Sequence, residues 1–205
     1  MINKYLQKSI VLFGGTFDPI HLGHINMAKR VNELISPAGI IFIPTGNSYL
    51  KNNVTDAQIR YSMVSKAIEP YRNFKISDIE VQSSEPSYTY KTIEYFKQKY
   101  QDFKLYFLIG EDSLLYIDKW KHPEILFENA ELLVARRNNN NSDIIFRKKE
   151  TLLNSYNGEI TIFDYDMPIS STEIRNAYKS GTIEPYKEYI IPDVNSIIIE
   201  KKLYK

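Results

Sequence analysis

Residues 10–24 read Ile10-Val11-Leu12-Phe13-Gly14-Gly15-Thr16-Phe17-Asp18-Pro19-Ile20-His21-Leu22-Gly23-His24. The apolar run at 10–13 is stopped by two glycines, which is typical of a buried parallel strand that ends in a tight loop. From residue 25 to 34, apolar side chains recur at helical spacing. A strand, a glycine loop and a helix in this order point backbone N–H groups and a helix N-terminus at a phosphate.

Two of the three histidines of the chain, His21 and His24, lie in this stretch. An imidazole pair beside a phosphate cradle can stabilise the charge that develops during phosphoryl or nucleotidyl transfer. Each feature alone has a plainer explanation, since a double glycine is often only a turn and such a histidine is often a helix cap. Together they are more specific, and the stretch matches neither the dinucleotide fingerprint nor the Walker loop.

The composition fits one folded domain of ordinary size. The chain has 205 residues, a formal net charge of +1 and no cysteine. A chain of this length can bury a substantial core, and with its charge nearly balanced no global basic field argues for nucleic acid or a membrane surface as partner. The absence of cysteine excludes disulfides and thiolate chemistry and favours a cytoplasmic location. The first residues are too polar for a signal peptide, and no apolar run reaches membrane-spanning length.

Strands and helices are expected to alternate along the rest of the chain. Strands are predicted over 39–44, 74–81, 103–109, 131–135 and 161–163. Helices are predicted from residue 55 or 56 to about 69, over 89–100, after His122-Pro123, over 144–153, from about 170, and in a closing segment at about 185–205. The asparagine-rich run at 138–142 predicts a mobile surface loop. Such alternation is typical of a parallel sheet in an α/β domain.

Loops after the strands hold further candidates, because open α/β sheets bind ligands at the carboxyl ends of their strands. Lys51 and Arg60 are candidate phosphate contacts, with solvated surface cations as the plainer interpretation. Asp112 follows the strand at 103–109 and could bind a ribose hydroxyl or a metal, with a helix cap as an equal alternative. Trp120 is the only tryptophan, and it could either pack against the core or be a platform for a flat ring. Its loop position makes the platform more attractive than it would be on an apolar helix face.

A second helix start that suits an anion lies at Ser170-Ser171-Thr172. Hydroxyl groups and free N–H groups occur together there, and Arg175 follows one turn into the helix. A capped helix with a surface arginine is the plainer alternative.

Four motifs follow one another along the chain: GGTFDPIHLGH at 14–24, SYT at 87–89, Gly110-x-Asp112 followed by Trp120, and ISSTEIR at 169–175. In this order they resemble the motifs of bacterial nicotinate-nucleotide adenylyltransferases of the nucleotidyltransferase superfamily. The resemblance runs from Ser9 to Tyr204. Phosphopantetheine adenylyltransferases share the first and last motifs but are shorter and lack the middle pair. Class I aminoacyl-tRNA synthetases carry a similar histidine motif in far longer chains.

The resemblance implies an α/β, Rossmann-like nucleotidyltransferase fold, a parallel sheet with helices on both faces, as a single domain over residues 1–205. It implies an enzyme of NAD biosynthesis that transfers the AMP moiety of ATP to nicotinate mononucleotide, giving deamido-NAD and pyrophosphate. The phosphate of the mononucleotide attacks the α-phosphorus in line without a covalent enzyme intermediate, and Mg²⁺ bridges phosphate oxygens. The expected partners are ATP and nicotinate mononucleotide, without nucleic acid or membrane, and a homo-oligomer is an open alternative to a monomer.

The resemblance also assigns roles to the candidate residues. His24, and with it His21, would stabilise the pentacoordinate α-phosphorus. The ATP-binding residues would be Gly14, Gly15 and Thr16 against the phosphates, Lys51 at a phosphate, Asp112 near the adenosine ribose, and Ser171, Thr172 and Arg175 at the β- and γ-phosphates. The substrate-binding residues would be Trp120, stacked on the pyridine ring, with Tyr88 and Thr89 near the nicotinate carboxylate. Backbone N–H groups in these two loops favour a carboxylate over a carboxamide. No side chain is assigned to a metal.

The sequence departs from the family pattern in two loops. Asn47-Ser48-Tyr49-Leu50-Lys51 stands where the family often has Asn-Pro-Pro-His-Lys, and Arg136-Arg137-Asn138 where it usually has Arg-Pro-Gly. Neither loop contains a residue expected at the reacting phosphorus, so altered affinity is expected rather than lost chemistry.

Two alternative functions use the same motifs. In the first, the chemistry is unchanged but the acceptor is nicotinamide mononucleotide or phosphopantetheine. In the second, the chain is a nucleotide-binding regulator that has lost catalysis. A regulator is expected to lose the histidines or the motif at 169–175, and both are intact here.

Overall fold

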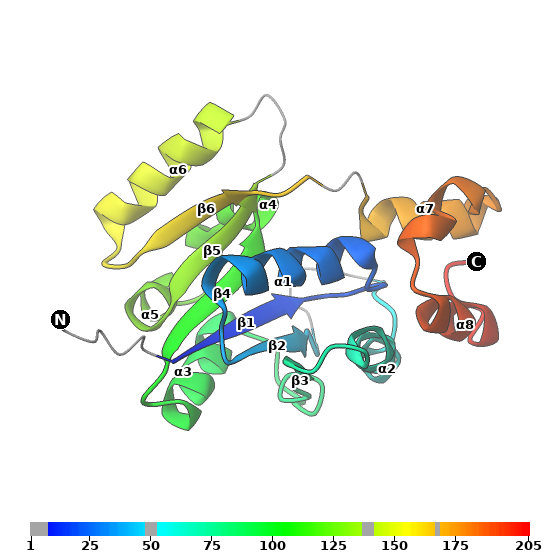
Figure 1. Ribbon diagram of the computed structural model, residues 1–205, viewed down its shortest axis with the longest axis horizontal. Coiled ribbons are helices and arrows are strands. Elements are labelled where there is room, and N and C mark those ends of the chain that lie inside the picture. The colour runs from blue at the N-terminus through cyan, green and yellow to red at the C-terminus, as the bar shows by residue number, and fades with distance from the viewer. Residues whose placement is uncertain (1–7, 48–52, 137–141, 167–168) are drawn as a thin grey trace.

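A sheet of six parallel strands, in the order β3-β2-β1-β4-β5-β6, lies at the centre of the molecule. The computed structural model in Figure 1 describes residues 8–47, 53–136, 142–166 and 169–205. The strands are β1 (Ser9–Gly15), β2 (Gly39–Pro44), β3 (Phe74–Ile76), β4 (Lys104–Gly110), β5 (Glu131–Arg136) and β6 (Ile160–Asp164). The chain winds outward from β1 to one edge and then, from β4, to the other edge, as in doubly wound folds. This confirms the expected α/β fold class.

Helices connect the strands, close to the positions that the sequence predicts. They are α1 (Leu22–Ile35), α2 (Ala57–Ile68), α3 (Thr89–Lys99), α4 (Glu111–Leu114), α5 (Pro123–Asn129), α6 (Ser142–Ser155), α7 (Ser171–Ser180) and α8 (Pro192–Glu200). Two 3₁₀ turns, η1 (Ile117–Lys119) and η2 (Glu184–Tyr189), complete the described elements. No helix within the described ranges is long and apolar enough to cross a membrane.

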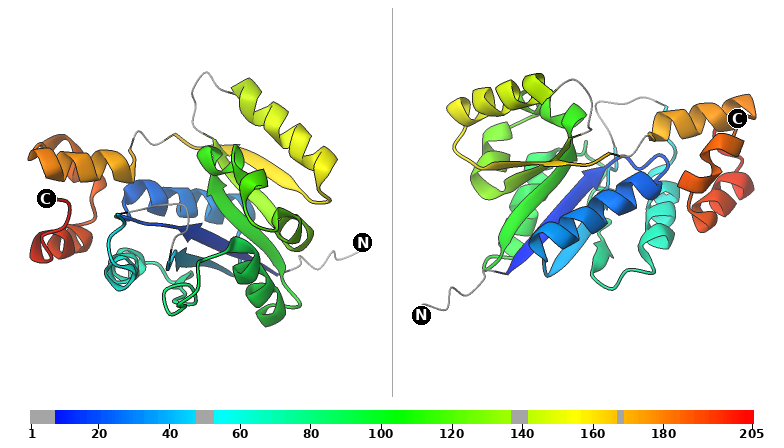
Figure 2. Two further views of the ribbon diagram at one scale, coloured as in Figure 1. Left: turned by 180° about the vertical axis from the view of Figure 1, so that it is seen from behind. Right: turned by 45° about the horizontal axis from the view of Figure 1, so that its top comes forward.

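Side chains along β1 alternate between two apolar cores. Val11 and Phe13 belong to the core that also contains residues of α1, α2 and α8, whereas Ile10 and Leu12 belong to the core with residues of α3, α5 and α6. All four side chains are buried, and a strand that is apolar on both sides needs cover on both faces. Figures 1 and 2 show α1 on one face of the sheet and α3 and α5 on the other.

The strand predicted over 74–81 is wrong beyond residue 76. β3 pairs with β2 at three positions only, and Ser77 then donates its N–H to the carbonyl of Phe42 at 2.9 Å. Residues 79–81 form a turn. The polar residue at position 80 therefore does not mark the solvent face of a strand. Its carboxylate instead accepts a hydrogen bond from Thr92 Oγ1 at 2.7 Å.

The predicted closing helix at 185–205 is divided. η2 ends at Tyr189 and α8 begins at Pro192, because proline fits the first position of a helix but not its interior. Of the loop predicted at 138–142, residues 138–141 lie outside the described residues, and Ser142 already begins α6.

Candidate active site

Two clefts open at the carboxyl ends of the strands. The larger cleft, of about 640 Å³, lies where the strand order reverses between β1 and β4. It is lined by the strand ends at 13–15 and 109–110 and by residues that include Thr16, Phe17, His24, Thr45, Glu80, Ser87, Thr89, Asp112, Tyr116, Lys119 and Trp120. A reversal of strand order is where open α/β sheets bind ligands, since the adjacent loops diverge to opposite faces.

The smaller cleft, of about 500 Å³, lies between the loop after β1 and the start of α7. Its lining residues are Thr16, Phe17, Asp18, His24, Asn53, Val54, Ser171, Thr172 and Arg175. In Figure 1, α7 lies beyond the carboxyl ends of the strands, at the end of the sheet opposite to the N-terminus. Thr16, Phe17 and His24 line both clefts, so molecules bound in the two clefts would meet beside His24.

The two histidines have different surroundings. His24 lines both clefts, whereas His21 lines neither and is buried. Nδ1 of His21 accepts from the N–H of Gly23 at 3.1 Å, and Nδ1 of His24 accepts from the N–H of His21 at 3.3 Å. The pair thus forms a reciprocal cap at the start of α1, with ring centroids 3.9 Å apart. Because Nδ1 of each ring accepts, a neutral ring carries its proton on Nε2.

Neighbouring aromatic rings leave little room for a side chain at Gly14 and Gly15. A Cβ on Gly14 would lie 3.2 Å from the ring of Phe107, and a Cβ on Gly15 would lie 2.8 Å from the ring of Phe17. Both glycines also line the larger cleft. Close approach of a phosphate to their backbone therefore stays a prediction, while the need for glycine follows from the neighbouring rings.

Arg60 is neither a phosphate contact nor a solvated surface cation, so both interpretations of this residue are wrong: it is 1% exposed within α2 and lines neither cleft. Its guanidinium donates four hydrogen bonds to backbone carbonyls, those of Thr55 (2.7 Å), Thr16 (2.7 Å), Thr45 (2.6 Å) and Gly46 (3.3 Å). Burial lowers the pKa of this guanidinium, and the nearby carboxylate of Asp18 opposes the shift. An arginine stays charged under such conditions. One buried cation thus joins the loops that follow β1 and β2 to the start of α2.

The start of α7 is tied to the loop after β1. Ser170 Oγ caps the helix by accepting from the N–H of Glu173 at 3.2 Å, and Ser171 Oγ donates to the carbonyl of Pro19 at 2.9 Å. Arg175 donates to the carbonyl of Asp18 at 2.8 Å through one Nη and to Thr172 Oγ1 at 3.2 Å through the other. The helix is therefore capped, as the plainer alternative supposed, and Ser171, Thr172 and Arg175 also line the smaller cleft.

The loop before α3 brings Ser87 and Thr89 to the larger cleft. Ser87 Oγ accepts from the N–H of Gly46 at 3.1 Å, and a Cβ on Gly46 would lie only 1.8 Å from the carbonyl oxygen of Glu80. The loops after β2 and β3 are thus in backbone contact, and glycine is required at residue 46. Burial raises the pKa of the Glu80 carboxyl, and hydrogen bonds from Thr92 and Ser87 oppose that shift.

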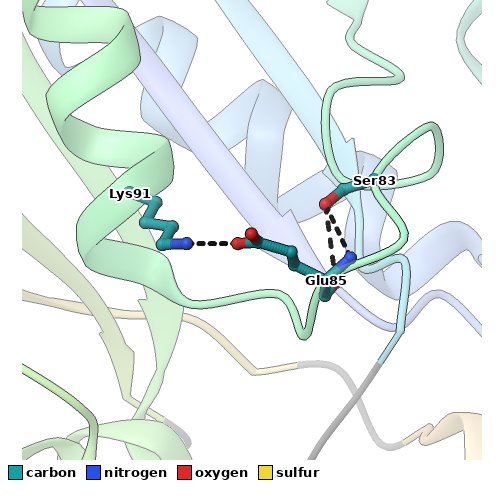
Figure 3. Close-up of polar contacts among 3 residues, drawn as sticks. All are labelled: Ser83, Glu85 and Lys91. Atoms are coloured by element: carbon teal, nitrogen blue, oxygen red, sulfur yellow. Dashed lines mark hydrogen bonds and ion pairs between the residues drawn. The ribbon is translucent and has the colours of Figure 1, made fainter.

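Polar contacts among Ser83, Glu85 and Lys91 join this loop to the first turn of α3, as Figure 3 shows. Ser83 Oγ accepts from the N–H of Glu85 at 3.1 Å, and Lys91 in the first turns of α3 pairs with the carboxylate of Glu85. The hydrogen bond from Lys91 and its charge lower the pKa of Glu85. This pair is exposed, so it contributes little to the stability of the fold.

Three residues predicted around the pyridine and ribose differ in position. Trp120 lines the larger cleft with its ring edge-to-face on Phe107, the centroids 6.3 Å apart. Asp112 also lines this cleft, and the helix-cap alternative is wrong because Gly110 occupies the N-cap of α4. Tyr88 is not among the lining residues, and its ring lies 4.6 Å from Lys121 Nζ.

Lys51 lies outside the described residues. Over the described ranges, no three His, Cys, Asp or Glu side chains are grouped so that they could hold a metal ion.

Sequence reasoning missed several residues of the clefts, among them Asp18, Asn53, Glu80 and Ser87. Asp18 and Ser87 stand inside quoted motifs, so their place in a motif is a signal that could have found them. Asn53 and Glu80 lie in loops after β2 and β3, and position after a parallel strand is the signal for both.

A model of the cytidylyltransferase-like family matches residues 12–177 of the chain. A protein of Clostridium botulinum (strain Okra / Type B1), named "Probable nicotinate-nucleotide adenylyltransferase", is 40% identical over 209 residues, which cover 100% of both chains. A protein of Clostridium tetani with the same name is 40% identical over 202 residues, covering 97% of this chain and 100% of its own.

Two solved structures of Plasmodium falciparum nicotinic acid mononucleotide adenylyltransferase share the fold. The complex with NaAD has a TM-score of 0.80 and the complex with APC a TM-score of 0.75. Each is 23% identical and covers 96% of this chain and 97% of its own. The Rossmann-like arrangement of this chain therefore matches that of the two complexes along nearly its whole length.

Proposed function

The chain belongs to the nicotinate-nucleotide adenylyltransferase family, enzymes of NAD biosynthesis, and from that premise we propose that it transfers the AMP moiety of ATP to nicotinate mononucleotide, giving deamido-NAD and pyrophosphate. The observation that carries the proposal is the position of His24, where the larger and smaller clefts meet. The α-phosphorus of an ATP molecule with its adenosine in the larger cleft and its β- and γ-phosphates in the smaller cleft would lie at this junction, within reach of an acceptor bound in the larger cleft. The cysteine-free composition supports the cytoplasm as the location.

In the proposed step, an oxygen of the mononucleotide phosphate forms a bond to the α-phosphorus of ATP. The bond from that phosphorus to the bridging oxygen of pyrophosphate breaks, with the attacking and leaving oxygens in line. Nε2–H of His24 donates to a non-bridging oxygen of the α-phosphate, where negative charge increases. His21 acts through His24, because its backbone N–H holds Nδ1 of that ring.

The two clefts support a division of the substrates between them. The β- and γ-phosphates would occupy the smaller cleft, at Ser171, Thr172 and Arg175, with Lys51 as a further contact. The backbone at Gly14, Gly15 and Thr16 would face the phosphates between the clefts. The nucleosides would occupy the larger cleft, with the adenosine ribose near Asp112 and the pyridine ring on Trp120. Mg²⁺ enters as the ion bound to the phosphates of ATP and belongs to the substrate.

The proposed preference for a carboxylate is supported by the start of α3. Thr89 is the first residue of this helix and lines the larger cleft, and Tyr88 gives the helix no side-chain cap. Helix N-termini favour negative groups, so nicotinate fits this position better than neutral nicotinamide.

Pyrophosphate release with Mg-ATP tests the proposal when three acceptors are offered in parallel. Nicotinate mononucleotide should give fast release, and nicotinamide mononucleotide and phosphopantetheine should give little. Comparable release with nicotinamide mononucleotide would contradict the carboxylate preference at Thr89. Release with none of the three would contradict catalysis and favour a nucleotide-binding regulator.

Replacing Trp120 with alanine should raise KM for nicotinate mononucleotide about tenfold or more, because stacking on an aromatic ring is lost. KM for ATP should change much less, which steady-state kinetics with each substrate varied in turn would measure. The matched control is Tyr116→Ala, an exposed aromatic on the same cleft that has no proposed stacking role. An unchanged KM for the mononucleotide in Trp120→Ala would contradict the proposed pyridine site.

A further inference from the structure

The hydroxyl of Tyr204, which follows α8, donates a hydrogen bond to Oδ1 of Asp18 at 2.7 Å. The two residues are 186 positions apart in the sequence. Figure 1 shows α8 beside α2 and below α7. The hydrogen bond between Tyr204 and Asp18 places the segment that follows α8 against the loop after β1. Burial and the nearby carboxylate of Asp18 raise the pKa of Tyr204, so its hydroxyl remains a donor.

The Asp18 carboxylate also accepts from a second segment. Oδ2 accepts from the N–H of Thr55 at 3.2 Å, and Asp18 as a whole is 5% exposed. The carbonyl of the same residue accepts from Arg175 of α7 at 2.8 Å. Asp18 therefore connects three segments, at 53–55, at the start of α7 and after α8. The first two of these segments line the smaller cleft, as does Asp18 itself.

Three of the six non-glycine residues with positive φ in the described ranges lie around this connection. Phe17, Asn53 and Tyr204 have φ angles of 50°, 56° and 60°, in the left-handed region. Residues other than glycine and asparagine rarely adopt this backbone region, so an aromatic residue there is held in place by its surroundings. Phe17 and Asn53 line the smaller cleft, and Tyr204 donates its hydrogen bond to Asp18, which lines the same cleft. A lost partner would therefore release a strained loop on one wall of the cleft.

We propose that Tyr204 is a positioning residue for triphosphate binding: its hydroxyl fixes Asp18, and Asp18 fixes the walls of the smaller cleft. The inference rests on the proposed function, because it takes the smaller cleft as the site of the β- and γ-phosphates. It assigns to the segment after α8 a part in substrate binding beyond packing against the core.

Isothermal titration with Mg²⁺ and α,β-methylene-ATP, a non-hydrolysable analogue, tests this inference without any acceptor. In Tyr204→Phe, the Kd should rise about five- to tenfold, because the hydrogen bond to a carboxylate is lost while the ring stays. In turnover assays, KM for ATP should rise by a similar factor, and kcat should stay within about twofold.

Tyr178→Phe is the matched control. Its hydroxyl donates to Asn195 Oδ1 and so joins α7 to α8, and its ring lies 6.1 Å from that of Tyr204, between centroids. The control should lower the melting temperature about as much as Tyr204→Phe and leave the Kd within about twofold. An equal loss of affinity in Tyr178→Phe would mean that general loosening of α7 and α8 is the cause, and would overturn the inference.

A second variant removes the charge at the other end of the bond. In an Asp18→Asn background, adding Tyr204→Phe should change the Kd by less than about twofold, because the interaction is already weakened. A full five- to tenfold further change would overturn the inference. An unmodified chain that bound no analogue would overturn both the inference and the proposed function, whereas a wrong acceptor alone would leave the titrations unaffected.

Discussion

Replacement of His24 by alanine is expected to lower kcat by about two to four orders of magnitude, while the Kd for ATP changes by less than about threefold. His24 lines both clefts and is the histidine at their junction. A donor placed at that point interacts most strongly when charge increases on the α-phosphate, so its loss affects the transition state more than the bound substrate. Stopped-flow measurement of pyrophosphate release and titration with a non-hydrolysable ATP analogue would separate the two effects.

His24 also accepts from the N–H of His21, so alanine removes part of the helix cap as well as the proposed catalytic group. His24→Asn separates these functions, because an amide oxygen can replace the cap while the imidazole is absent. Both variants should lose turnover alike, and the asparagine variant should be the more stable. His122→Ala, at an exposed histidine paired with Glu124, should keep wild-type turnover. Wild-type turnover in His24→Ala would remove His24 from the mechanism.

Arg60→Met is expected to lower the free energy of unfolding by about 3–5 kcal/mol. Methionine fills a similar volume, but the four carbonyls that now accept from the guanidinium would be left without this donor. Buried acceptors without a partner lose their hydration and gain nothing in return. Urea unfolding followed by circular dichroism would measure the change in midpoint at constant slope.

The control for Arg60 is Arg30→Met. Arg30 pairs with Glu33 at 3.2 Å on the surface, where its side chain is 49% exposed. Its loss should change the free energy of unfolding by no more than about 0.5 kcal/mol. Equal effects in the two variants would show that Arg60 contributes no more than an exposed cation and would contradict its role in joining the loops.

Much of the fold could be predicted because local patterns determine it. The run at 10–15 and the run at 39–44 are apolar at every position that a strand with two buried faces requires, and both end at glycine or proline. Asp56 and Ser170 are capping residues whose side chains accept at the starts of α2 and α7, as the sequence suggests. These interactions join residues close in sequence, so a single chain reveals them.

Other features depend on contacts that no local pattern records. Arg60 resembles a surface cation in sequence, and only the fold brings the carbonyls of Thr16 and Thr45 around it. Glu80 belongs to an alternating run and still turns inward to Thr92, because β3 ends before it. Likewise, the spacing of His21 and His24 places both near the helix start, but tertiary packing decides which ring reaches the clefts.

The shared wall of the two clefts has a consequence for inhibition. Only Thr16, Phe17 and His24 among the described residues belong to both clefts. A compound confined to the smaller cleft would compete only with the β- and γ-phosphates of ATP, and a compound confined to the larger cleft would leave the triphosphate site open. A compound that passes His24 and enters both clefts would displace the nucleosides and these phosphates together and gain from linkage, since its second half binds as an intramolecular event. Bisubstrate analogues that also carry a polyphosphate chain are therefore the chemical form best matched to this site.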